Sequence, residues 1–151
     1  GGYGKGRQLL GVGFSDVDGN GVDANGDYRA AIVSSEWTAG AITAAREMIG
    51  HYAALDAKDP AAAQAGEWLA ELRADERGML EGLETLRLDH VPDAGFDALL
   101  ATGSQPYLYA NRRAMVPFGW YANPLPSTCA TAWRVMLARN FNPLASRKAV
   151  P

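Results

Sequence analysis

Residues 16–27 hold the densest group of oxygen ligands and turn-forming residues in the chain. Counted from Asp16 as position 1, side-chain oxygens fall at positions 3, 5 and 12, and Gly21 stands at position 6. This is the ligand spacing of an EF-hand-type calcium loop, in which glycine allows a sharp bend and position 7 offers its backbone carbonyl. The sequence therefore predicts a calcium site with five ligand residues: Asp16, Asp18, Asn20, Val22 and Asp27.

The same loop departs from the calcium-loop pattern at two positions. Position 8 is Asp23 where an aliphatic residue is usual, and position 12 is Asp27 where glutamate is usual. Asp, Asn and Gly are also the common residues of surface turns. A turn-rich loop that binds no metal is therefore the alternative interpretation.

The segment from Pro117 to Ser127 is the best candidate for ligand binding. It interleaves Trp120, Tyr121 and Asn123 with prolines, which hold the backbone extended. Aromatic rings that stack on C–H faces, beside amides that bond hydroxyl groups, suit a sugar ring. The alternative is that these aromatic side chains close the end of a helical core.

Helical periodicity and capping residues predict four helices that would position these segments. The first covers 28–52, with Asp27 as its N-cap. Others are predicted from Pro60 to about 88, over 93–101, and from Ser127 or Thr128 to about 140. No alternating strand pattern is convincing, so the predicted class is all-α, with helical hairpins and long ordered loops. The buried stripe predicted for the first helix consists of Val33, Trp37, Ala41, Ala44, Met48 and Tyr52.

The second predicted helix contains three glycines, Gly66, Gly78 and Gly82. Each glycine weakens a helix by up to about 1 kcal/mol relative to alanine. Their presence predicts that another element packs closely against this helix, or that the helix is kinked.

Composition argues against several classes of protein. A net charge of −3 over 151 residues offers no basic stripe for nucleic acid, and no apolar run approaches the roughly 18 residues that span a bilayer. His51 and His90 lack ligand-like spacing to a cysteine, so zinc is not expected. Cys129 is expected to be packed and inert. The chain begins at Gly1 with no signal peptide, as expected for a mature product or an excised fragment.

Two segments together resemble a known family. Residues 34–42 (SSEWTAGAI) and 117–128 (PFGWYANPLPST) resemble the closing hairpins of α/α-toroid, six-hairpin glycosidase-like proteins. The resemblance implies that residues 1–151 form a single helical domain, or the C-terminal part of a larger toroid domain. It also implies a secreted or periplasmic carbohydrate-active protein that binds a glycan or hydrolyses its glycosidic bonds.

The resemblance also implies roles for individual residues. Glu36 would be the general acid or base of a glycoside hydrolase, and Asp23, Asp27 or a residue elsewhere would supply the second carboxylate that such enzymes need. The glycan would be bound by six residues: Trp37, Tyr109, Arg113, Trp120, Tyr121 and Asn123.

A different class of protein accounts for the same residues. A non-catalytic, calcium-stabilised helical module could use its exposed aromatic residues to dock another protein chain or to assemble into an oligomer. Trp, Tyr and Arg dominate the hot spots of protein interfaces as well as sugar sites.

Overall fold

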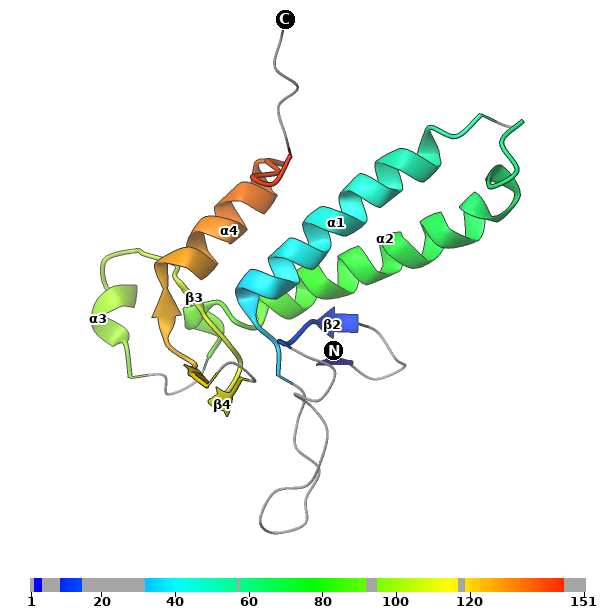
Figure 1. Ribbon diagram of the computed structural model, residues 1–151. Coiled ribbons are helices and arrows are strands. Elements are labelled where there is room, and N and C mark those ends of the chain that lie inside the picture. The colour runs from blue at the N-terminus through cyan, green and yellow to red at the C-terminus, as the bar shows by residue number, and fades with distance from the viewer. Residues whose placement is uncertain are drawn as a thin grey trace, which may run out of the picture.

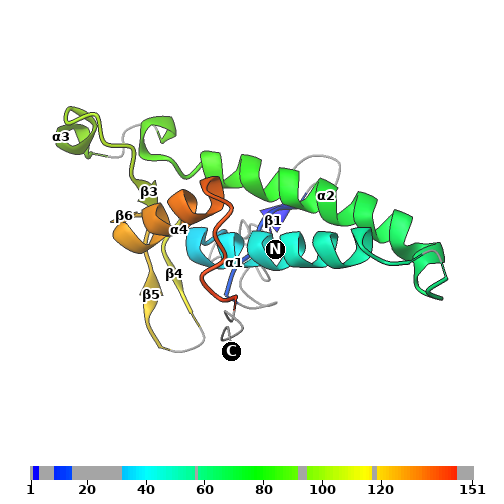
Figure 2. The ribbon, with the colours of Figure 1, turned by 90° about the horizontal axis from the view of Figure 1, so that it is seen from above.

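A computed structural model of the chain describes residues 2–3, 9–14, 32–56, 58–91, 95–116 and 119–145. Two long helices, α1 (Ser35–Ala53) and α2 (Ala62–Glu84), lie side by side as an antiparallel hairpin (Figures 1 and 2). We call residues 48–75, next to the turn between the helices, the tip of this hairpin. The opposite half, formed by 35–47 and 76–84, is called the base. The C-terminal helix α4 (Thr128–Ala138) packs against α1 at the base.

Helix α1 begins later than the sequence predicts. Ser34 is its N-cap and is extended, with φ −104° and ψ 131°, and it forms an antiparallel bridge with Ala110. Beside this bridge, the Val33 backbone N–H donates to Asn111 Oδ1 at 2.9 Å. These contacts with a distant segment hold residues 32–34 out of the helix. The prediction that Asp27 caps α1 is therefore wrong, and Asp27 itself lies outside the described residues.

The buried stripe of α1 also differs from the prediction. Trp37 is 47% exposed and Met48 is 44% exposed, although the periodicity placed both in the core. The buried face consists instead of mostly small side chains, which allow α2 and α4 to approach closely: Ser35, Thr38, Ala39, Ile42, Thr43 and Ala45. The large side chains Trp37 and Met48 lie beside this helix contact and are exposed, Trp37 at the base and Met48 at the tip.

The glycines of α2 have different roles along the helix. Gly82 is buried against the strand β2 (Leu9–Gly11), which pairs with β1 (Gly2–Tyr3). A Cβ at Gly82 would lie 1.7 Å from the carbonyl oxygen of Leu10, so no larger residue fits without moving that backbone. A Cβ at Gly66 would meet nothing within 4 Å. The predicted close approach is thus confirmed at Gly82 and is wrong at Gly66.

The predicted all-α class is only partly correct, because the structure combines helices with short strands. The described residues also contain short strands in addition to β1 and β2. Strand β3 (Tyr107–Leu108) pairs with β6 (Pro126–Ser127), and β4 (Ala114–Met115) pairs with β5 (Tyr121–Ala122), both antiparallel. Strands of two residues are too short to show an alternating pattern, which explains why the sequence did not reveal them.

The remaining helices are shorter than predicted. The 3-10 helix η1 (Leu88–His90) follows α2, and α3 (Asp97–Leu100) stands in place of the longer helix predicted over 93–101. The start of α4 is as predicted, because the Ser127 hydroxyl accepts a hydrogen bond from the Ala130 N–H at 3.3 Å.

Glu84, at the end of α2, joins three elements at the base. Its Oε1 accepts hydrogen bonds from Arg134 Nη2 of α4 at 2.7 Å and from the Tyr107 hydroxyl of β3 at 3.0 Å. Arg87 donates to the other carboxylate oxygen at 3.2 Å. Burial alone would raise the pKa of Glu84, but these hydrogen bonds and positive charges together lower it.

The arrangement of the described residues is a single long hairpin, joined at its base by α4 and the short strands. No ring of helical hairpins is formed by this part of the chain. None of its helices combines the length and the apolar character required to cross a membrane.

Candidate functional site

The N-terminal ends of α1 and α4 bring the predicted acid Glu36 together with two hydrogen-bond donors. Glu36 is in the first turn of α1 and is half-buried. Its Oε2 accepts a hydrogen bond from the Tyr109 hydroxyl at 3.3 Å, across 73 residues of sequence. A negative charge is favourable in the first turn of a helix, because the backbone N–H groups there point toward it.

Tyr109 is held in position by its own backbone. Its N–H donates to the Leu125 carbonyl at 2.9 Å, and its carbonyl accepts from the Ser35 N–H at 2.9 Å, directly beside Glu36. Burial, followed by the charge of Glu36 and the hydrogen bond to it, raises the pKa of Tyr109 to about 12. The hydroxyl therefore remains protonated and donates to Glu36 throughout the physiological range.

Cys129 is the second polar group close to Glu36. It lies in the first turn of α4 and is exposed as a residue. Partial burial of the thiol, the charge of Glu36 and a hydrogen bond to that carboxylate raise the pKa of Cys129. A protonated thiol is a poor nucleophile, so its chemistry here is that of a weak hydrogen-bond donor.

Tyr109 and Trp37, the neighbour of Glu36 in sequence, belong to an aromatic cluster with Phe14 at its centre. The Phe14 ring lies 6.0 Å from Trp37 and 5.4 Å from Trp120, edge to face in both pairs. It also stacks on Tyr109 at 6.1 Å, and Trp120 lies 5.9 Å from Tyr109. Phe14 is buried, whereas Trp37 and Trp120 are 47% and 41% exposed. Each indole therefore packs against the buried Phe14 ring and also faces solvent. We call Glu36, Trp37, Tyr109 and Trp120 the indole site.

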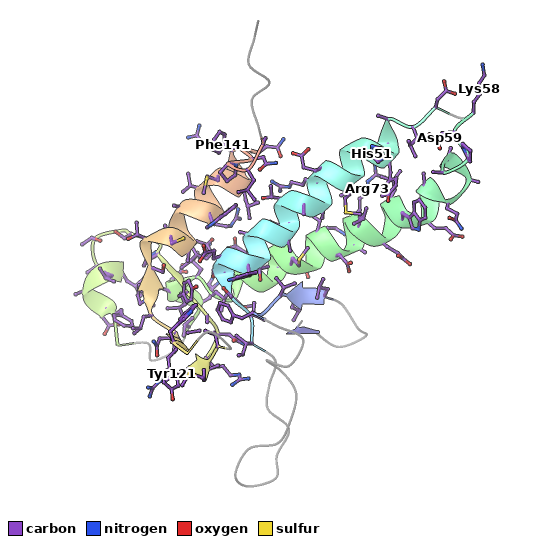
Figure 3. All side chains as sticks on the ribbon, viewed as in Figure 1. His51, Lys58, Asp59, Arg73, Tyr121 and Phe141 are labelled. Atoms are coloured by element: carbon purple, nitrogen blue, oxygen red, sulfur yellow. The ribbon has the colours of Figure 1, made fainter. Side chains whose placement is uncertain are left out.

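The other predicted glycan-binding residues form a neighbouring patch on the β4–β5 hairpin. The Arg113 guanidinium lies 4.2 Å from the centre of the Tyr121 ring, and Asn123 Nδ2 donates to the Tyr121 carbonyl at 3.1 Å. Ala122 faces the core, so Tyr121, one residue earlier on the strand, faces outward and is 46% exposed. Figure 3 shows Tyr121 at the end of the molecule opposite Lys58 and Asp59. Among the described residues, the hydrogen bond and the cation–π contact of this patch do not involve Glu36.

The predicted calcium ligands cannot be compared with the structure. Asp16, Asp18, Asn20, Val22 and Asp27 all lie outside the described residues, as does Asp23. Within the ranges that the structure describes, no group of three or more His, Cys, Asp or Glu side chains could hold a metal ion. The calcium site therefore stays a prediction from the sequence.

Two residues that adjoin the indole site were not predicted to contribute to it. Phe14 follows a run of glycines that shows no periodicity, and only its contacts reveal its role. Cys129 was expected to be inert. That expectation agrees with its raised pKa, but its contact with Glu36 joins residues 93 positions apart, which sequence spacing alone does not indicate.

Comparison of the chain with models of protein families, with curated proteins and with solved structures gave no match.

Proposed function

We propose that the indole site binds a glycan. The observation that carries this proposal is the pair of exposed indoles, Trp37 and Trp120, packed on one buried ring beside a fixed carboxylate. The C–H face of a sugar would stack on an indole, and its hydroxyls would donate to the free lone pairs of Glu36. The toroid-like segments of the sequence agree with this function.

Binding is a better-supported activity than hydrolysis. A glycosidase of the common type needs two carboxyl groups about 5–10 Å apart. The observed partners of Glu36, Tyr109 and Cys129, suit the fixing of a carboxylate for hydrogen bonding to a ligand. Hydrolysis would depend on Asp23, Asp27 or a residue from elsewhere, and Glu36 would then serve as the general acid or base.

Affinity electrophoresis against a panel of neutral and acidic polysaccharides tests the proposal. Trp37→Ala and Trp120→Ala should each weaken binding about tenfold, since stacking on one ring contributes on the order of 1–2 kcal/mol. Glu36→Gln should weaken it several-fold, and it should abolish the release of reducing sugar if hydrolysis occurs. Trp68→Leu, at the tip, is the control and should bind normally.

Two outcomes would overturn the proposal. One is that no polysaccharide binds the protein. The other is that both indole variants, shown to be folded by circular dichroism, bind as well as the unmodified chain. In the second case the exposed indoles would be better explained as anchors for a protein partner, which size-exclusion chromatography of the two variants would reveal.

A further inference from the structure

We propose that a pocket at the tip of the hairpin binds an organic ammonium ion. The pocket has a volume of about 250 Å³ and lies in the groove between α1 and α2. It is separate in sequence and in structure from the indole site. Six residues line it: Met48, Tyr52, Trp68, Glu71, Leu72 and Asp75.

The spacing of these residues on each helix explains why their side chains line the same pocket. Met48 and Tyr52 are four residues apart, so they lie on the same face of α1. Trp68, Glu71, Leu72 and Asp75 follow a spacing of three, four and seven residues on α2. The pocket therefore combines apolar and aromatic side chains of both helices with two carboxylates of α2.

The apolar part of the pocket suits a soft, poorly hydrated cation. The Tyr52 and Trp68 rings are 4.9 Å apart and inclined at 47°, so they meet at an angle and leave part of each face uncovered. Such faces attract cations, with trimethylammonium groups as a common ligand. Met48, which is 44% exposed, adds a polarisable thioether to the same wall.

The charge of the pocket is uncompensated in the part of the chain that the structure describes. Neither Glu71 nor Asp75 forms a hydrogen bond or an ion pair with any described residue. One residue further along the helix, Glu76 is paired with Arg46 at 2.6 Å. Two free carboxylates beside aromatic faces favour a ligand that is both cationic and apolar, and they disfavour an anion or a neutral sugar.

The basic residues near the pocket do not change its preference for a cation. Figure 3 places His51 and Arg73 at the tip of the hairpin. His51 packs edge-on against the Tyr52 ring at 5.3 Å. Arg73 and Arg77 lie two residues beyond Glu71 and Asp75, a spacing that directs side chains to a different face of the helix. Neither arginine lines the pocket.

Choline is the probe, and its neutral analogue with a tert-butyl group in place of trimethylammonium is the control ligand. In saturation-transfer NMR on the full chain, choline should bind at least tenfold more tightly than the neutral analogue. The double variant Glu71→Gln/Asp75→Asn should remove this difference by weakening choline alone. Trp68→Leu should weaken both ligands, whereas Glu67→Gln, on the same helix but outside the pocket, should bind choline normally.

A short neutral peptide with one trimethyllysine tests whether the ammonium group belongs to a small molecule or to a protein side chain. Tighter binding of the peptide than of choline would indicate a protein side chain, and weaker binding would indicate a small molecule. Equal binding of choline and its neutral analogue would overturn the proposal, as would unchanged choline affinity in the double variant. Glycan binding by these variants should be normal, so the two proposals can fail independently.

Discussion

The base and the tip of the α1–α2 hairpin both bring carboxylates close to aromatic rings, but the carboxylates beside those rings differ in their partners. At the base, Glu36 accepts a hydrogen bond from Tyr109, and Glu84 accepts from Tyr107 and Arg134. At the tip, Glu71 and Asp75 lack such partners among the described residues. A carboxylate held by donors presents its remaining lone pairs to hydroxyl groups in a fixed orientation, whereas a carboxylate without such partners can reorient toward a cation.

The difference arises from what packs against each half of the hairpin. Strand β2, helix α4 and the β3–β6 pair all gather at the base (Figures 1 and 2). At the tip, the described contacts are mainly those between α1 and α2 themselves. The same combination of aromatic and acidic residues therefore supports a structured site at one end and an open, charged groove at the other.

The largest expected effect is on stability, and it is tested by substituting two glycines of α2. Gly82→Ala should destabilise the protein by about 3 kcal/mol, because its Cβ would overlap the Leu10 carbonyl oxygen. Gly66→Ala, where a Cβ meets nothing within 4 Å, should stabilise it by about 0.5–1 kcal/mol. Urea unfolding followed by circular dichroism measures both. Equal effects of the two substitutions would show that β2 does not pack on the base in solution.

A smaller effect is expected at the paired acid Glu84. Glu84→Gln should cost about 1–2 kcal/mol near neutral pH, because it weakens charge-assisted hydrogen bonds at the base. The folded state lowers the pKa of Glu84 below the ordinary value of 4.5. The unfolded chain therefore binds the proton first as the pH falls, and this part of the stability is lost from about that value downward.

Chemical denaturation between neutral pH and the acid range measures this contribution. The unmodified protein should lose stability more steeply than Glu84→Gln as the pH falls below 4.5. An equally steep loss of stability in Glu84→Gln and in the unmodified protein would contradict the role given to Glu84 at the base.

The smallest effect concerns the ionisation of Tyr109. Its pKa of about 12 has burial as the main cause and the charge of Glu36 as the second. Glu36→Gln should therefore lower the pKa of Tyr109 while leaving it above the ordinary value of 10.0. Because the folded-state value is raised, the associated stability is present below pH 10 and is lost as the pH rises toward 12.

Absorbance of tyrosinate in the near ultraviolet, compared between the unmodified protein and Glu36→Gln, follows this ionisation. Tyr109→Phe identifies the component that belongs to Tyr109. If the tyrosine that ionises at the highest pH has the same pKa in both proteins, Glu36 does not accept a hydrogen bond from the Tyr109 hydroxyl.

Local sequence signals determined several features of this protein. The Ser127 cap and the apolar period that follows it correctly predicted α4, because capping and periodicity act over a few residues. The glycine at position 82 correctly indicated a close approach to another segment. These features depend on residue type and short spacing.

Only the tertiary structure decided where α1 begins, which of its faces is buried, and what surrounds Glu36. The bridge between Ser34 and Ala110 prevents the helix from starting earlier, and small residues form the buried face because α2 and α4 approach closely. Phe14, Tyr109 and Cys129 reach the same carboxylate region from three distant segments. Contacts of this kind depend on how the chain folds back on itself, and no local pattern encodes them.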